Sequence, residues 1–125
     1  MDFQVTWTDS PSEFGRRLRS ALAGGVPGPI RRAMGDIALE IERRAKQNAP
    51  VDTGTLRASI ASTVEELGGQ AIAAIVGSPV EYAGFVELGT VYMGAQPYLR
   101  PAIREASSFI RSRLESAVSE VFMQV

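Results

Sequence analysis

The sequence predicts a single α+β domain, in which a small, mostly antiparallel β-sheet packs with two N-terminal helices and a long C-terminal helix. Three observations predict this class. The 125 residues are enough for one domain but few for two. Apolar residues recur at helical spacing in residues 30–48 and 98–122. Two stretches that carry isoleucine, valine or threonine, 55–67 and 70–78, flank a pair of glycines, which is typical of a hairpin.

The first 29 residues predict a strand and a helix. Residues 3–8 alternate apolar and polar side chains, as a half-buried strand does. Ser10, Pro11 and Glu13 then supply an N-cap, a first-turn proline and a capping glutamate, so a helix should run to about Ala23. Glycines and prolines between residues 24 and 29 should end it.

The middle of the chain predicts a second helix and a hairpin. The helix should run from Ile30 to about Asn48 and end before Pro50, because the residue before a proline avoids the helical region. Residues 55–67 and 70–78 should form the two strands. The second strand is almost continuously small or aliphatic, so we expect both of its faces to be covered, one of them by a helix.

The C-terminal part predicts two further helices. A short helix over residues 80–88 should end at Gly89 in a left-handed conformation. A final helix from about Tyr98 to Phe122 holds Pro101 in its first turn, where a missing N–H costs little. We expect this last helix to pack across the sheet.

The composition excludes several classes of function. The chain has no cysteine and no histidine, which removes thiol nucleophiles, Ser-His-Asp triads and the usual zinc and haem ligands. Most hydrolytic chemistry is thereby excluded, and we expect no cofactor and no metal site. The longest aliphatic run, residues 71–76, is far shorter than the ~20 residues that span a bilayer. Thirteen basic and fourteen acidic residues do not indicate a dedicated nucleic-acid binder.

Asp52-Thr53-Gly54 is the one tripeptide that suggests catalysis, because aspartic proteases carry it and retroviral proteases are small homodimers of similar length. Two such aspartates would meet and share a proton. In those enzymes the aspartate follows an apolar strand, whereas here residues 43–50 form the polar end of a predicted helix. The flanks favour a surface turn, with Asp52 as its cap and Gly54 in an unusual backbone conformation. A protease homodimer remains an alternative function.

Three segments in sequence resemble the gene-ten-product-like tail-component family of phage Hong Kong 97. They are residues 49–60 (APVDTGTLRASI), 82–90 (YAGFVELGT) and 93–102 (MGAQPYLRPA). The resemblance covers about residues 30–110, with residues 1–29 outside it and 111–125 as the end of the last helix. The motif and turn residues are Pro50, Asp52, Thr53, Gly54, Leu56, Arg57, Gly89, Thr90, Pro97 and Pro101.

The resemblance implies a structural protein without enzymatic activity, at the neck, or head-proximal end, of a long phage tail. Such a protein completes the tail and joins it to the capsid connector as a homo-oligomeric ring, with six copies favoured and twelve as the alternative. Its partners would be other neck, connector and tail proteins. DNA would pass through the channel without sequence-specific binding. The protein would assemble in the host cytoplasm, reside in the virion and need no membrane.

The charge distribution suggests where a channel wall could lie. Residues 47–98 hold one basic and five acidic side chains. A lumen that passes DNA without holding it should be poor in cations, because each phosphate contact adds affinity. We expect two of four carboxylates, one pair or the other, to point toward the lumen or a neighbouring ring: Glu65 and Glu66, or Glu81 and Glu87.

Aromatic and aliphatic residues of the second and third motifs are candidates for loop packing that sets the ring geometry. Ordinary core positions are the alternative for them. A small intracellular adaptor without a phage role remains a second alternative function. The candidate interface residues are Tyr82, Phe85, Glu87, Tyr98 and Leu99.

Overall fold

The computed structural model describes residues 25–50, 54–68 and 71–123. The strand expected at residues 3–8 and the helix expected at 10–23 lie outside these ranges. The elements are α2 (Gly28–Asn48), α3 (Thr55–Ser59), β1 (Ala61–Leu67), β2 (Ala71–Gly77), α4 (Ala83–Leu88), α5 (Leu99–Glu105) and α6 (Ser107–Met123). The predicted α+β class is confirmed.

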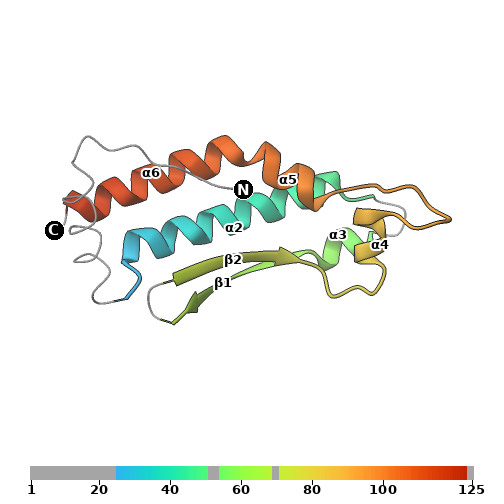
Figure 1. Cartoon of the computed structure of the whole chain (residues 1–125), viewed down its shortest axis with the longest axis horizontal. Helices are drawn as coiled ribbons and strands as arrows, with labels where there is room; N and C mark the ends of the chain where they lie inside the picture. The colour runs from blue at the N-terminus through green and yellow to red at the C-terminus, as the bar shows by residue number, and fades with distance from the viewer. Residues whose placement is uncertain (1–24, 51–53, 69–70, 124–125) are drawn as a thin grey trace.

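Helix α2 is the middle layer of an elongated body. In Figure 1, α5 and α6 run along one side of α2, and the β1–β2 hairpin runs along the other. Helices α3 and α4 lie together at the end of the body where α2 finishes, and the turn of the hairpin lies at the opposite end. Every long element of the fold therefore packs on α2.

The buried stripe of α2 explains its central place. Its buried residues recur every four positions from Pro29 to Ala45 and include Ile37 and Ile41, with Ala38 beside them. The helix begins two residues earlier than expected, so Gly28 and Pro29 belong to its first turn and not to the preceding loop. A proline at this place loses no helical hydrogen bond, because the first N–H groups have no partner inside the helix.

Helix α3 replaces the first part of the expected first strand. The prediction of a strand over residues 55–67 is wrong for Thr55–Ser59, which is helical, and correct from Ala61. Gly54, with φ 71°, turns the chain into the helix, and Leu56 is 3% exposed in the core. The helix ends where the Ile60 N–H donates to the Arg57 carbonyl. The leucine, arginine and alanine of this segment are strong helix formers, and their preference outweighs the strand preference of the β-branched residues beside them.

The two strands pair antiparallel, with Ala61 opposite Gly77 and Leu67 opposite Ala71. Side chains alternate between the faces of a sheet. Ser62 faces α2, since its hydroxyl donates to Glu42 at 2.8 Å. The opposite face is open. No residue of β2 is buried, and Ile75 is 46% exposed, so the expectation that both faces of this strand are covered is wrong for the described chain. The expected contact with a helix is confirmed, because β2 packs on α2.

The expected final helix is two helices that meet at Ala106. The Ser107 hydroxyl donates to the Ile103 carbonyl at 3.3 Å, a side-chain bond that bends helices by competing with the backbone ladder. Ala106 itself is fully buried. The two helices pack on α2 and not across the sheet, which lies on the other side of α2 (Figure 1), so that expectation is also corrected.

Alanines allow α5 and α6 to approach α2 closely. Ala33 and Ala45 of α2 and Ala102 and Ala117 of the C-terminal helices have no exposed surface. The larger buried residues fill the space between α2 and the helices α3, α4, α5 and α6. This part of the core holds Ile37, Ile41, Leu56, Ile60, Tyr98 and Ile110.

We predict that Ala45→Leu lowers the free energy of unfolding by about 1–3 kcal/mol, because the added atoms have no space between packed elements. The matched control is Gln47→Leu, which places the same side chain at an exposed position of the same helix. Chemical denaturation measures both. Equal stability of the two variants would show that the helices of the core can separate without cost.

Candidate functional site

The second and third sequence motifs form one corner of the molecule, which consists of α4, residues 89–97 and the start of α5. We call residues 89–97 the arm, because they project beyond the rest of the body (Figure 1). The Gly89 N–H donates to the Phe85 carbonyl at 2.7 Å and ends α4. The Gln96 N–H donates to the Val86 carbonyl at 2.8 Å and returns the chain to α4. The arm is thus tied at both of its ends.

The carboxylate of Glu87 caps helix α5 from eleven residues earlier in the chain. Its Oε1 accepts the N–H groups of Tyr98 and Leu99, each at 2.8 Å, and its Oε2 accepts the Arg100 N–H at 3.2 Å. The next residue, Pro101, has no N–H to satisfy. One side chain therefore satisfies the donors that the first turn of a helix leaves unpaired.

The surroundings of Glu87 determine its charge state. Burial acts to raise the pKa of this carboxyl, since the side chain is only 9% exposed. The three backbone N–H groups and the Arg100 charge act against burial and hold the pKa below its ordinary value. Glu87 is therefore an ionised, structural carboxylate.

The expectation that Glu87 points toward a lumen is wrong. Its carboxylate lies inside the protein, and its lone pairs are taken up by the backbone of α5. Of the other three carboxylates, Glu66 faces α2 and pairs with Arg31. Glu65 and Glu81 are exposed. Their position relative to a channel stays a prediction.

Tyr98 joins the three sequence motifs in the core. It is 1% exposed, and its hydroxyl donates to the Ala83 carbonyl of the second motif at 3.3 Å. The same cluster of buried residues contains Leu56 of the first motif and Ala102 of the third. Burial and the Glu87 charge raise the pKa of the Tyr98 hydroxyl, so it stays protonated as a donor. Tyr98 is therefore a core residue. This is the alternative that the sequence analysis gave to loop packing at a ring interface.

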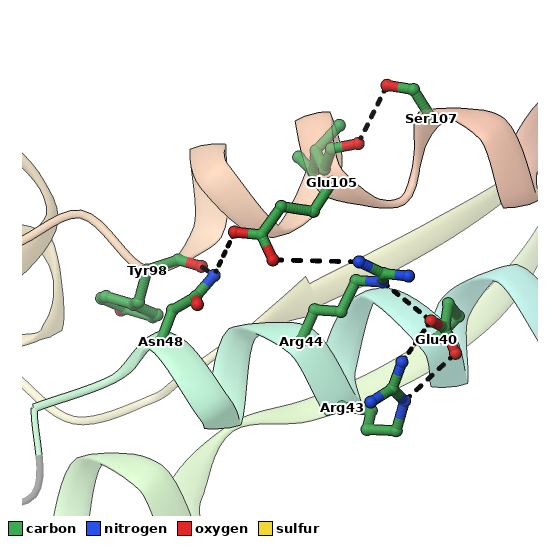
Figure 2. Close-up of polar contacts among 8 residues, drawn as sticks. Glu40, Arg43, Arg44, Asn48, Tyr98, Glu105 and Ser107 are labelled. Atoms are coloured by element: carbon green, nitrogen blue, oxygen red, sulfur yellow. Dashed lines mark hydrogen bonds and ion pairs between the residues drawn. The ribbon is translucent and has the colours of Figure 1, made fainter.

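A chain of polar contacts links the corner to α2 (Figure 2). The Asn48 side-chain amide donates to the Tyr98 carbonyl at 3.5 Å and to Glu105 at 3.2 Å. Arg44 lies between two carboxylates, at 2.8 Å from Glu40 and 3.8 Å from Glu105. The network fixes the end of α2 against α5. Sequence inspection did not single out Asn48 or Glu105, because the contacts of Asn48 with Tyr98 and Glu105 span 50 and 57 residues of sequence.

The backbone conformation of the arm depends on Gly89 and Thr90. Gly89 has φ 78° and ψ 172°, a conformation open essentially to glycine alone, so the expected left-handed stop has a positive φ but a more extended ψ. A Cβ there would lie 2.8 Å from the Ala95 nitrogen. The Thr90 hydroxyl accepts the N–H groups of Tyr92 and Met93, each at 3.1 Å. These contacts form a turn at the tip of the arm.

The side chains at the tip and on α4 are apolar and exposed. Val91 is 95% exposed and Tyr92 99%. Phe85 and Tyr82 are 59% and 40% exposed, so these candidate residues lie on the surface, whereas Leu99 is half-buried against the core. Surface groups of this size and character are typical of an interaction site.

An open groove of about 490 Å³ lies at the base of the arm. Apolar side chains and two arginines line it, and sequence inspection did not identify it. The lining residues are Glu87, Leu88, Ala95, Pro97, Arg100, Ile103 and Arg104.

Asp52 and Thr53 of the protease tripeptide lie outside the described residues. Gly54 is described and precedes a helix, and α2 ends a few residues earlier, at Asn48. The described flanks therefore lack the apolar strand that carries the aspartate in a protease. Of the other first-motif residues, Arg57 is exposed and Pro50 half-buried.

The described ranges hold neither a cluster of metal ligands nor a membrane-spanning helix. Residues 25–50, 54–68 and 71–123 contain no group of three or more aspartates and glutamates that could hold a metal ion. None of the helices in that part of the chain is long and apolar enough to cross a membrane.

Comparison with known proteins gave one family. The family model described as "Bacteriophage HK97-gp10, putative tail-component" matches residues 12–89. The match includes part of the N-terminal segment that we expected to fall outside the resemblance, and it ends before the third motif. No curated protein and no solved structure matched the chain.

We predict that Glu87→Gln lowers the free energy of unfolding by about 2 kcal/mol at neutral pH, because hydrogen bonds to a charged acceptor are replaced by weaker ones. A carboxyl whose pKa is lowered by folding stabilises the protein above the ordinary value of about 4.3, and this contribution is lost as the pH falls through the folded-state pKa. Denaturation at a series of pH values should show a smaller acid dependence for the variant. Glu81→Gln, at an exposed position, is the control and should match the parent protein.

We also predict that Gly89→Ala lowers the free energy of unfolding by about 1–3 kcal/mol, since alanine disfavours this backbone conformation. The control is Gly84→Ala in α4, where an added Cβ meets no atom within 4 Å. Thermal denaturation should place the control at or above the parent protein. A Gly89 variant as stable as that control would contradict the role of Gly89 in holding the arm.

Proposed function

Because the chain belongs to the HK97-gp10-like family of bacteriophage tail components, we propose that it is a structural protein at the head-proximal end of a phage tail. It forms a ring, completes the tail and joins it to the capsid connector around the DNA channel. Six copies fit a tail, and twelve would fit a portal. The observation that carries the proposal is the family match over residues 12–89.

The surface of the chain supports an assembly role. The exposed apolar tip of the arm, Val91 and Tyr92, is held in a defined turn by Thr90, so its display is built into the fold. Large apolar side chains that are fixed in this way and left in water are typical of surfaces that a partner covers. Other tail and neck proteins, and further copies of the chain, are the partners that this role requires.

The charges of α2 support DNA passage without DNA binding. Four of its arginines pair with carboxylates of the same chain, so these cations are not available to phosphates. The pairs are Arg31–Glu66, Arg32–Glu120, Arg43–Glu40 and Arg44–Glu40. Since each phosphate neutralised by a cation adds affinity, arginines that already pair with carboxylates reduce the tendency of the ring to hold DNA. Of the exposed carboxylates that the sequence analysis considered, Glu81 is the one that we propose to face the lumen or a neighbouring ring.

The proposed role is structural and needs no catalysis. The aspartic-protease alternative makes a separate prediction, because two chains would meet at Asp52 and cleave peptides. Asp52→Ala would then abolish peptidase activity in a dimer. In a tail protein the same substitution changes only a turn.

We predict that native mass spectrometry of the purified chain shows a closed oligomer of six or twelve copies. A nonsense mutation of its gene, in the phage that encodes it, should leave filled capsids and tails that do not join. Expression of the chain from a plasmid should restore complete particles. Electron microscopy and plaque counts measure both effects.

Three outcomes would contradict this role. A dimer whose peptidase activity depends on Asp52 would indicate the protease. Normal particles without the chain would exclude a tail component and leave an adaptor role in the host cell. A complete particle that lacks the chain by mass spectrometry would have the same meaning.

A further inference from the structure

Some charged side chains of the described ranges form no ion pair there. Among residues 25–50, 54–68 and 71–123 these include Glu65, Arg104 and Arg100, although the Arg100 charge also acts on the buried Glu87. Glu65 and the two arginines lie at opposite ends of the body. Glu65 is near the end of β1, which lies far from the arm in Figure 1, whereas the arginines line the groove at the base of the arm.

From this arrangement, and resting on the ring proposed above, we infer that the hairpin end of one copy enters the groove of the next copy. Glu65 of one copy pairs with Arg104 in the groove of its neighbour. The groove stays positive because it holds two arginines, Arg100 and Arg104, against the one carboxylate of Glu87. The contact joins two different surfaces, so it is heterologous. Repeated contacts of this type close into a ring when the rotation between copies permits.

The apolar parts of the two surfaces match as well. Leu67, at the end of the hairpin, is 52% exposed, and the groove offers Leu88 and Ile103. The two ends therefore agree in both charge and hydrophobicity. Opposite charges at such a contact speed association and exclude wrong orientations.

The same contact covers the open face of the sheet. The arm projects beyond the body (Figure 1) and contributes Ala95 and Pro97 to the groove, so it would lie along the hairpin that enters from the neighbour. Tyr92, which is 99% exposed, then reaches the outer face of β1 and β2, where Ile75 is 46% exposed. This accounts for the aliphatic sequence of β2, which is typical of a strand covered on both faces. The second face is covered by another copy.

The alternative occupant of the arginine groove is DNA. Two arginines could contact phosphates, but apolar residues supply most of the groove lining, and phosphate contacts do not need them. The groove thus favours a protein surface that carries both an aliphatic side chain and a carboxylate. The experiment separates the two occupants.

The test exchanges charges at residues without a partner in the described chain. Glu65→Arg and Arg104→Glu should each weaken self-association roughly tenfold or more, because each places like charges opposite one another. Mixing the two variants should restore rings with equal numbers of each, since every contact in an alternating ring again joins opposite charges. The chain that carries both substitutions should also form rings by itself. Native mass spectrometry and analytical ultracentrifugation measure these states.

One control variant and one further test variant accompany the charge exchange. Arg111→Glu changes an exposed arginine of α6 that also lacks an ion pair in the described residues but lies outside the groove, so it should leave the ring intact. Tyr92→Ala should weaken association roughly tenfold, as loss of an aromatic anchor does. Circular dichroism of every variant should match the parent protein, which shows that folding is unchanged.

The absence of cysteine allows a direct test of proximity. A chain with Glu65→Cys and Arg104→Cys should form a ladder of covalent multimers on oxidation, whereas each single variant should stop at a dimer. Rings that survive both charge reversals and give no ladder would overturn this contact and leave the proposed ring standing. Loss of binding to duplex DNA in Arg104→Glu, with rings unchanged, would assign the groove to DNA. Normal particles without the chain would instead contradict the proposed function.

Discussion

The carboxylate of Glu87 is the interaction on which the corner of the molecule depends. It extends from the last turn of α4 and caps α5, so these two helices must keep a fixed separation for the three backbone bonds to form. That separation places Tyr98 in the core and directs α5 and α6 along α2. The cost of burying the charge is offset because every bond is made to a helix start, where the backbone dipoles favour an anion.

Helix α2 is the second constraint, because all long elements pack on it and on no other shared layer. Its alanines permit close approach, and its charged side chains pair with residues of α5, α6 and β1. Pairs of this exposed kind contribute little to stability. They do, however, place a carboxylate beside each arginine of the helix.

The surfaces that we propose for assembly depend on the shape of the fold. The arm, the groove and the open sheet face are held by backbone bonds and by core packing, and none of them requires a reactive side chain. Exposed aromatic and aliphatic side chains are unfavourable in water, and association would remove this free-energy cost by burying them. The absence of histidine and cysteine is consistent with a role in assembly, where surfaces and not chemistry are under constraint.

The sequence by itself determined the α+β class, the extent of α2, the hairpin around residues 68–70 and the family motifs, because periodicity and turn residues act over a few positions. It also identified Glu87, Tyr98 and Gly89, but not their roles. Only the tertiary structure decided that Glu87 caps a distant helix, that Thr55–Ser59 is helical and that the last helix bends at Ala106. These features depend on contacts between segments far apart in the chain, and local sequence patterns do not predict which segments come into contact.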